Sequence, residues 1–420
     1  MRDKLLDFSK LCVDGMSLMD GQQVAGLDTY VSYGVYIHEK LDLEKMEAAV
    51  NRLYHEIDTF RLRLRREKEG KFYEYVDATE YKISVLDAKG ETLEEKKAYV
   101  QEYVLKRTHQ IQNRELESPL VVEFFRLEEE EYFTAVYLDH YISDGHSIGV
   151  TLMKMMSYYT GSEIPGSISQ GNIHNYIAYQ NSDELENRAS LAADYWKEEL
   201  KDYTISGYRI DENQEKCFEE SPVCIKYDKS EFVDFAKRNR CTLGNLITGI
   251  YHLALAGTFG SMDNVISYVS TDRNSVEHWG LIGPFLKPLN HRVKLNPELT
   301  VKQYLKQISG ISGKNLIHKD AHICDIGLNR YGLTYMNHSK LFLTDPRFTQ
   351  WMPEMRMDCI KNSFILLRVQ ELENTVETDF ICNPEYFNRS DYLKFIEKYD
   401  ACMKKIRSSL PDDKLEQFLL

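Results

Sequence analysis

The pattern of apolar and polar positions predicts strands and helices that alternate along the chain. Residues 29–37 are rich in Tyr, Val and Ile, which is typical of a half-buried strand. Asp42 then stands at a helix N-cap position, and apolar residues follow at three- and four-residue intervals, as on the buried face of an amphipathic helix: Leu43, Met46, Ala49, Val50, Leu53 and Ile57. Further strands are predicted near 72–76, 120–127 and 131–142, and a helix over 147–159. This order favours an α/β fold.

The second half of the chain has the same kind of order. Residues 224–228 open it, a helix is predicted over 232–240, and Thr242 is the expected N-cap of an apolar helix over 243–259 that leads into a strand near 264–274. Gly, Ser and Pro concentrate in 160–172, which indicates a boundary. We predict an N-terminal lobe of residues 1–165, a linker region of 166–200 and a C-terminal lobe of 201–420. No short repeat is visible, which argues against a solenoid.

Composition narrows the class of protein. Of the 420 residues, 43% are apolar and 28% charged, as in an ordered globular protein with room for two cores. The net charge of -14 argues against a nucleic-acid partner, and an acidic protein partner would need a local basic patch. Eight scattered cysteines without a CxxC pair indicate reduced thiols. We see no secretory signal or membrane span, so a cytoplasmic protein without a membrane partner is expected.

The candidate chemistry lies in the stretch YLDHYISDGHS, at the predicted end of a strand. The sheet would hold His140 rigidly, and its imidazole is suited to accept a proton from an attacking amine or hydroxyl. Gly145 allows a tight turn, and backbone N–H groups after it would open a helix and face a developing oxyanion. Asp144, if buried, needs a cationic partner and would shape the loop. A core histidine beside a turn aspartate, or a metal site, are the alternative interpretations.

The segment Asp139–Gly145 resembles the HHxxxDG signature of the condensation-domain superfamily. That superfamily shares its fold with chloramphenicol acetyltransferase and includes the amide-forming domains of nonribosomal peptide synthetases. His140 occupies the position of the second, catalytic histidine, whereas Asp139 replaces the first. The resemblance implies an α/β fold of two chloramphenicol acetyltransferase-like lobes, which form a V-shaped pseudo-dimer with a central tunnel.

Other stretches resemble the family in the same order along the chain. Arg61 stands in the arginine position of the family's "LR" helix end, which implies an ion pair with Asp144; Arg63 is the fallback, and a solvated helix-end charge is the other interpretation. The remaining matches are Asp272-Arg273, Gly283-Pro284-Phe285 with Leu289 and Arg292, and Tyr335-Met336-Asn337. Lys287 replaces an asparagine of the family pattern, and the DFGWG motif has no counterpart, which points away from a standard chain-elongating domain.

The resemblance implies a free-standing acyltransferase of secondary-metabolite biosynthesis that joins an acyl group to an amine or an alcohol, with amide formation favoured. The acyl donor would be a thioester on the phosphopantetheine of a carrier protein or on coenzyme A, with no metal or tightly bound cofactor. The residues implied to line the substrate tunnel are Asp139, Ser147, Gly283 and Asn337. We expect a monomer.

The alternative is a module that binds carrier proteins without turnover. Asp139 supports it, because a carboxylate pointing at His140 would favour the protonated imidazole. Alternation along a strand instead predicts that the two side chains face opposite sides. A metal site at His318, Asp320 and His322 is disfavoured because few ligands are local, and His252 is predicted to be a core histidine.

Overall fold

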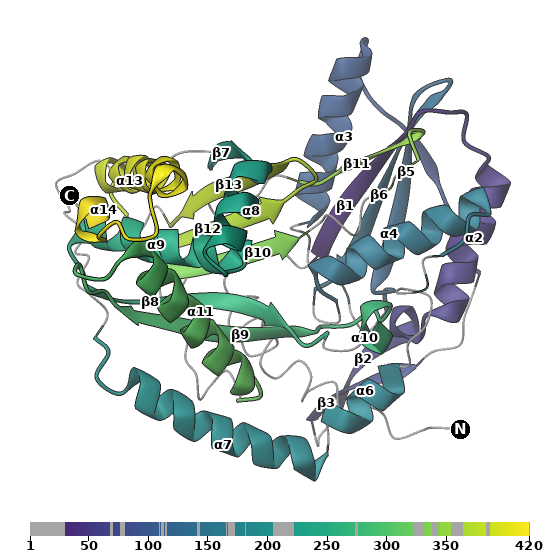
Figure 1. Ribbon diagram of the computed structural model, residues 1–420. Coiled ribbons are helices and arrows are strands. Elements are labelled where there is room, and N and C mark those ends of the chain that lie inside the picture. The colour runs from purple at the N-terminus through teal and green to yellow at the C-terminus, as the bar shows by residue number, and fades with distance from the viewer. Residues whose placement is uncertain are drawn as a thin grey trace. The chain divides into compact units, whose positions relative to one another are not determined.

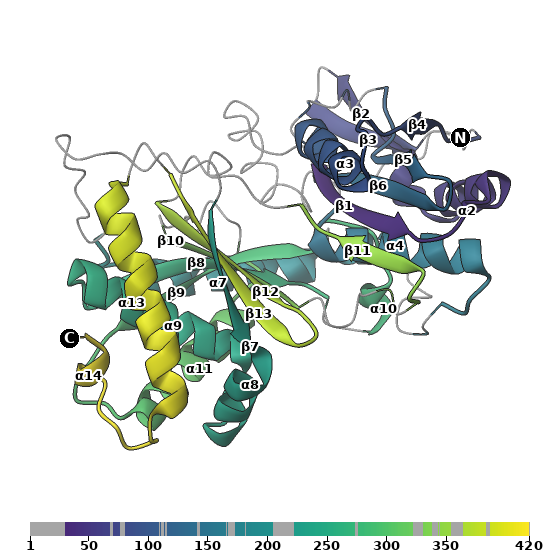
Figure 2. The ribbon, with the colours of Figure 1, turned by 90° about the horizontal axis from the view of Figure 1, so that it is seen from above.

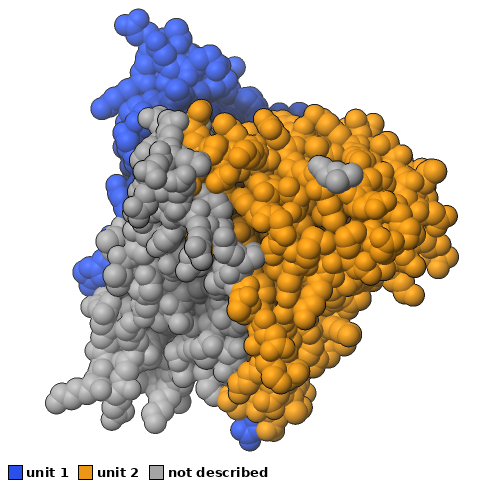
Figure 3. Space-filling model, turned by 90° about the vertical axis from the view of Figure 1, so that its left-hand side faces the viewer, with its two compact units in different colours: residues 1–183, 271–286, 340–354 blue, residues 184–270, 287–339, 355–420 orange. Residues whose placement is uncertain are grey.

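The computed structural model describes most of the chain as two compact units. The described residues are 30–67, 70–75, 80–108, 110, 113, 116–140, 143–164, 166, 173–180, 182–204, 222–273, 276–321, 331–337, 343, 345–353, 364–383 and 387–419. Unit 1 comprises residues 1–183, 271–286 and 340–354, and unit 2 comprises residues 184–270, 287–339 and 355–420 (Figure 3). Each unit has its own sheet and its own apolar core.

Unit 1 is built on a five-stranded sheet. Its strand order is β11 (Phe348–Trp351), β1 (Tyr30–Ile37), β6 (Glu131–Asp139), β5 (Leu120–Glu128) and β4 (Val85–Asp87), with only the β4–β5 pair parallel. Helices α2 (Leu43–Glu56) and α4 (Gly145–Thr160) cover one face, and α3 (Leu93–Thr108) covers the other (Figure 2). The unit also contains η1 (Asp58–Arg61), the hairpin β2 (Leu62–Glu67) and β3 (Gly70–Tyr75), α6 (Ile173–Gln180) and α10 (Val276–Trp279).

The central strand β6 is buried on both faces, and its residues alternate between two cores. Val136 and Leu138 pack with α2 and α4, whereas Ala135 and Tyr137 pack with α3. The strand ends at Asp139, and packing against both cores fixes the position of this end. His140 therefore leaves the sheet at a defined point. The sequence therefore determines where the chain turns towards α4.

Unit 2 is built on a six-stranded sheet. Its strand order is β7 (Val223–Asp228), β13 (Thr375–Cys382), β12 (Ile365–Glu371), β10 (Tyr331–Asn337), β8 (Asp263–Thr271) and β9 (Leu286–Lys294), and β10 runs parallel to both β12 and β8. The described helices of this unit are α7 (Asp183–Leu200), α8 (Lys229–Arg238), α9 (Leu243–Phe259), α11 (Val301–Ile317), α13 (Arg389–Ser408) and α14 (Glu416–Leu419) (Figure 1).

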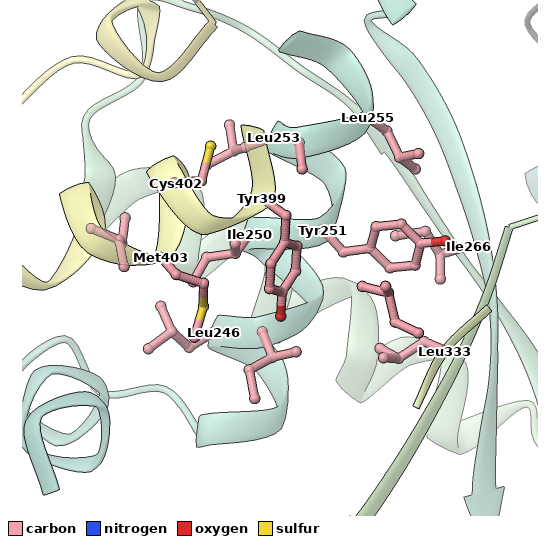
Figure 4. Close-up of a cluster of buried hydrophobic side chains, with 14 of the residues drawn as sticks. Leu246, Ile250, Tyr251, Leu253, Leu255, Ile266, Leu333, Tyr399, Cys402 and Met403 are labelled. Carbon is pink, nitrogen blue, oxygen red and sulfur yellow. The ribbon is translucent and has the colours of Figure 1, made fainter. Parts of the chain in front are cut away.

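Helix α9 forms the centre of the unit 2 core because it is apolar nearly all round. Its Leu246, Ile250 and Leu253 meet Tyr399 and Met403 of α13 (Figure 4). A helix of this kind is buried on several sides, since a single apolar stripe would have left one face in solvent. The central helix therefore packs against α8, α11, α13 and α14.

The two predicted N-caps are confirmed. The Asp42 carboxylate accepts a hydrogen bond from the backbone N–H of Lys45, and the Thr242 hydroxyl accepts one from Asn245. Strand β6 ends at Asp139, three residues before the predicted end at 142. Among the described residues, no helix has both the length and the apolar character that crossing a membrane requires.

The predicted division into continuous lobes is wrong. Residues 340–354 belong to unit 1 and not to a lobe of residues 201–420, because β11 pairs with β1. Residues 271–286 also belong to unit 1, where Arg273 and Gly283 bond to Asp144 and Ser147. The predicted linker is also divided, since α7 is part of unit 2, where the Trp196 indole N–H donates to the carbonyl of His318 at 2.9 Å. Strand pairing between distant segments therefore sets the boundaries, and local composition does not.

Candidate active site

His140 lies directly after β6, on the loop that leads to α4. Its Nδ1 is 3.0 Å from the carbonyl oxygen of Ser143. A carbonyl oxygen only accepts hydrogen bonds, so Nδ1 carries the proton and, in the neutral ring, Nε2 keeps its lone pair. The Ser143 hydroxyl in turn donates to the carbonyl of Asp139 at 2.8 Å, which closes the loop. Local backbone contacts therefore orient the imidazole and fix its tautomer.

Asp144 is the N-cap of α4 and is almost fully buried, at 1% exposure. Its Oδ1 accepts hydrogen bonds from the Ser147 backbone N–H and hydroxyl, both at 2.8 Å, and its Oδ2 accepts one from the Phe285 backbone N–H at 3.2 Å. A buried carboxylate with this many donors is held in one geometry. Asp144 therefore fixes the start of α4, as the sequence predicted for a loop-shaping residue.

The cationic partner of Asp144 is Arg273. The Arg273 Nη2 donates to Oδ1 at 3.0 Å, and each side chain is only 2% exposed. The Arg273 Nη1 also donates to the carbonyls of His278 and Leu281, and the guanidinium lies 4.1 Å from the centre of the Phe285 ring. Burial alone would raise the pKa of Asp144, but Arg273 and the bonds from Ser147 outweigh it, so this pKa lies below its ordinary value.

Ser147 joins α4 to residues 271–286. Its hydroxyl donates to Asp144 or to the Gly283 carbonyl, 3.0 Å away, and accepts from the Gly283 backbone N–H at 3.1 Å and from Arg273 at 3.0 Å. A Cβ added at Gly283 would lie 2.8 Å from the Phe285 ring, so glycine permits this close approach. The loop after β6 is therefore tied to a segment more than a hundred residues away in sequence.

The predicted ion pair between Arg61 and Asp144 is wrong. Arg61 lies at the end of η1 and pairs with Asp58, three residues earlier. The fallback partner, Arg63, is also bonded elsewhere. Its side chain is buried and donates hydrogen bonds to the Leu62 and Leu116 carbonyls. Both arginines find acceptors in their own surroundings, whereas Arg273 is the one that reaches Asp144.

Three residues predicted to line a substrate tunnel are buried within unit 1. Ser147 and Gly283 hydrogen-bond to each other, and their predicted place along a tunnel stays a prediction. Asp139 is 2% exposed and continues the alternation of Ala135 and Tyr137, which places it on the α3 face of the sheet. The fourth residue, Asn337, lies in unit 2, where it lines a cavity and donates to Glu371 at 2.9 Å, and its role stays a prediction.

Two side chains next to the site carry contacts that the sequence reasoning missed. The His146 Nε2 donates to the Trp279 carbonyl at 2.9 Å, and burial together with Arg273 lowers the pKa of His146. Asp272 accepts from Tyr176 at 2.9 Å and from Gln180 at 3.1 Å, which anchors α6. The sequence signals for these two contacts were His146, which directly follows the Asp144-Gly145 pair, and Asp272, which directly precedes Arg273.

Among the described residues, no group of three or more His, Cys, Asp or Glu side chains is placed to hold a metal ion. In the HKDAH stretch, His318 stacks on Tyr195 and Asp320 pairs with Arg188 at 2.6 Å, while His322 lies outside the described residues. His252 is a core histidine, as predicted, and lies 3.1 Å from the ring of His291.

Comparison with known proteins identifies the family. The family model described as "Condensation domain" matches residues 29–342, and the chain therefore belongs to the condensation-domain family. Its fold is that of solved condensation domains. The starter condensation domain of rhizomide synthetase RzmA, in complex with C8-CoA, superposes with a TM-score of 0.79 at 14% identity, covering 96% of this chain and 95% of that one. The condensation domain of Monacolin K polyketide synthase MokA gives a TM-score of 0.77 at 13% identity, with 96% and 97% covered.

The curated relatives are much longer proteins. Surfactin synthase subunit 1 of Bacillus subtilis (strain 168) is 25% identical over 293 residues, which are 68% of this chain but 8% of that protein. Bacitracin synthase 2 of Bacillus licheniformis is 23% identical over 235 residues, which are 54% of this chain and 9% of that protein. The chain therefore matches less than a tenth of the length of these relatives.

Proposed function

We propose that this chain is an acyltransferase that forms an amide bond between a thioester-bound acyl group and an amine in secondary-metabolite biosynthesis. The observation that carries the proposal is the tautomer of His140. The His140 Nδ1–H donates a hydrogen bond to the Ser143 carbonyl, and Nε2 is left as the proton acceptor that the reaction needs. Family membership supports acyl transfer as the reaction class.

In the proposed reaction, the amine nitrogen attacks the thioester carbonyl carbon and loses a proton to His140 Nε2. The new C–N bond gives a tetrahedral oxyanion, whose collapse breaks the C–S bond, and the proton then passes to the departing thiolate sulfur. The Ser147 N–H is already bonded to Asp144, so the first-turn N–H groups of Gly145 and His146 are the candidate oxyanion donors at the start of α4. No step requires a metal or a bound cofactor.

The donor in this proposal is an acyl thioester of phosphopantetheine, carried either by a carrier protein or by coenzyme A. The solved complexes of a similar domain with C8-CoA, and with C8-CoA together with Leu-SNAC, support a thioester donor and an amine acceptor. An alcohol acceptor would give an ester by the same proton transfer, because an imidazole base serves both nucleophiles.

The test replaces His140 by Ala and measures product by mass spectrometry, with acyl-CoA and acyl-carrier donors and a panel of amines and alcohols. We expect turnover to fall by about a hundredfold or more, the usual range for loss of a general base. His38→Ala is the matched control, because His38 lies in the same unit and its Nδ1 contacts Glu131, away from the site. Equal turnover in the His140 variant and the wild type would reject the assignment.

A binding module without turnover is the second candidate, and Asp139 in place of the first motif histidine favours it. Asp139 is buried on the α3 face of the sheet, opposite the side of Leu138. Alternation along the strand predicts that His140 faces the side of Leu138, so the Asp139 carboxylate would point away from the imidazole, and this weakens the second candidate. The same panel separates the two candidates. A binding module would retain carrier affinity and give no product with any donor and acceptor pair.

A further inference from the structure

Helix α6 presents one buried face to residues 271–286 of unit 1. Ile173, Tyr176 and Gln180 are buried and recur at three- and four-residue intervals, whereas Asn175 and Ala178 are exposed. A helix of eight residues is too short to be stable by itself in water, so tertiary contacts of its buried face have to hold it. The helix and the segment against which it packs therefore constrain each other.

Two side chains of α6 hold the carboxylate of Asp272. The Tyr176 hydroxyl and the Gln180 amide N–H both donate to the same oxygen, Oδ2, at 2.9 and 3.1 Å. These donors compensate a carboxylate that is only 3% exposed. Burial and the neighbouring Asp272 raise the pKa of Tyr176, so its hydroxyl keeps the proton that it donates. Asp272 is therefore fixed from α6.

The same helix contacts the other end of the segment. The Tyr176 ring lies 4.3 Å from the Phe285 ring, centre to centre. The Ile173 Cδ1 lies 3.3 Å from the position that a Cβ on Gly283 would take, so this side chain packs directly on the glycine. The Asp272 backbone N–H donates to the Phe285 carbonyl at 2.8 Å, which closes the segment into a loop. Helix α6 therefore contacts both ends of this loop.

The loop carries the groups that hold the start of α4. Its contacts there are those of Arg273 and the Phe285 N–H with Asp144, of the Gly283 N–H with Ser147, and of the Trp279 carbonyl with His146. The candidate oxyanion donors, the N–H groups of Gly145 and His146, lie in the same first turn. A shift of the loop would move these donors relative to His140, and a misplacement of about 1 Å can cost up to about a hundredfold in rate.

We infer that Tyr176 and Gln180 are positioning residues of the acyl transfer: through Asp272 they hold the loop that sets the start of α4. This inference rests on the proposed function for the reaction, and it adds a helix that acts on the site from the far side of the loop. The effect belongs to the transition state, because the start of α4 faces the charge that develops there.

The first test is Tyr176→Phe, which removes one hydroxyl and keeps the ring. We expect kcat to fall about tenfold, with the KM values of donor and acceptor within about twofold of the wild type. The matched control is Tyr159→Phe. Tyr159 is equally buried but lies in the last turn of α4, where its hydroxyl donates to Glu39 at 3.4 Å, and its loss should leave kcat unchanged. Urea unfolding verifies that both variants are fully folded in the assay buffer.

Two substitutions of Asp272 separate the hydrogen bonds from mere space filling. Asp272→Asn keeps an oxygen that can accept from Tyr176, whereas Asp272→Ala removes the acceptor. The Asn variant should retain kcat within about threefold of the wild type, and the Ala variant should lose about tenfold or more. Equal activity of the two variants would contradict a role for these bonds.

Hydrogen exchange followed by mass spectrometry reports the positioning without any turnover. The N–H groups of Ser147, Gly283 and Phe285 are bonded between the loop and the start of α4, or within it. Peptides that contain them should exchange about tenfold faster in Tyr176→Phe and at the wild-type rate in Tyr159→Phe.

Unchanged kcat in Tyr176→Phe would overturn the inference, and so would an equal loss in Tyr159→Phe. A fall in kcat without faster exchange at the start of α4 would also overturn it, because the loss would then arise elsewhere. The proposed function fails separately. Full turnover in His140→Ala would reject that function, and the exchange rates would still decide whether α6 holds the loop.

Discussion

Replacing Arg273 by Met should destabilise unit 1 more than any change at Arg61. The substitution leaves the Asp144 carboxylate buried at 1% exposure without its cation. Breaking a buried pair in this way costs about 3–5 kcal/mol, because one charge stays desolvated. Two carbonyls, those of His278 and Leu281, also lose a donor. We therefore expect a loss of at least about 3 kcal/mol in the free energy of unfolding at pH 7.

Urea unfolding followed by tryptophan fluorescence measures this loss, since Trp279 and Trp351 both lie in unit 1. Arg61→Met is the control. Its partner Asp58 is partly exposed, and removal of such a pair should cost less than about 1 kcal/mol. The double variant Asp144→Asn with Arg273→Met should recover much of the loss, because it removes the buried charge as well as its partner.

The pH dependence gives a second check on the same pair. In the wild type the pKa of Asp144 is lowered, so the charged carboxylate stabilises the folded protein. This stabilisation is fully present above the unfolded pKa of about 4, and it is lost as the pH falls through the folded-state pKa. Without Arg273, burial raises the pKa of Asp144, and the variant gains stability as the pH falls. The difference between the two proteins should therefore shrink from pH 7 to pH 4. A loss below about 1 kcal/mol at pH 7, or one that does not vary with pH, would refute this reasoning.

Three further predictions concern single positions. Ser147→Ala should cost about 1–3 kcal/mol in urea unfolding, because it leaves buried donors and acceptors unpaired; a change within error would contradict the network. Gly34→Val should lower the melting temperature, because even a Cβ would come within 2.2 Å of the Phe133 ring, and an unchanged value would exclude that clash. Burial lowers the pKa of His291 to about 4 and that of His252 well below its ordinary value, so unit 2 should lose stability as the pH falls from about 6.5 to about 4. Constant stability over that range would argue against neutral buried rings.

The elements that the sequence predicted well are those with a strong local signal. The caps at Asp42 and Thr242, and the apolar helix α9, depend on side chains within a few residues of one another. Helix α3 was not predicted because only Val100, Val104 and Thr108 of it are buried, so its apolar periodicity is weak. Its partners in unit 1 are distant in sequence, and tertiary packing stabilises it.

The sequence by itself determined the motif around His140, the family and the need of a buried Asp144 for a cation. Only the tertiary structure decided which arginine supplies that cation. Arg61 and Arg63 were the predicted partners and Arg273 was not, because an ion pair depends on distance in space, and 129 residues separate Asp144 from Arg273. The same holds for the unit boundaries, because the pairing of β11 with β1 joins segments that local composition assigned to different lobes. Local rules fix caps and periodicity, whereas long-range pairing is fixed only when the whole chain packs.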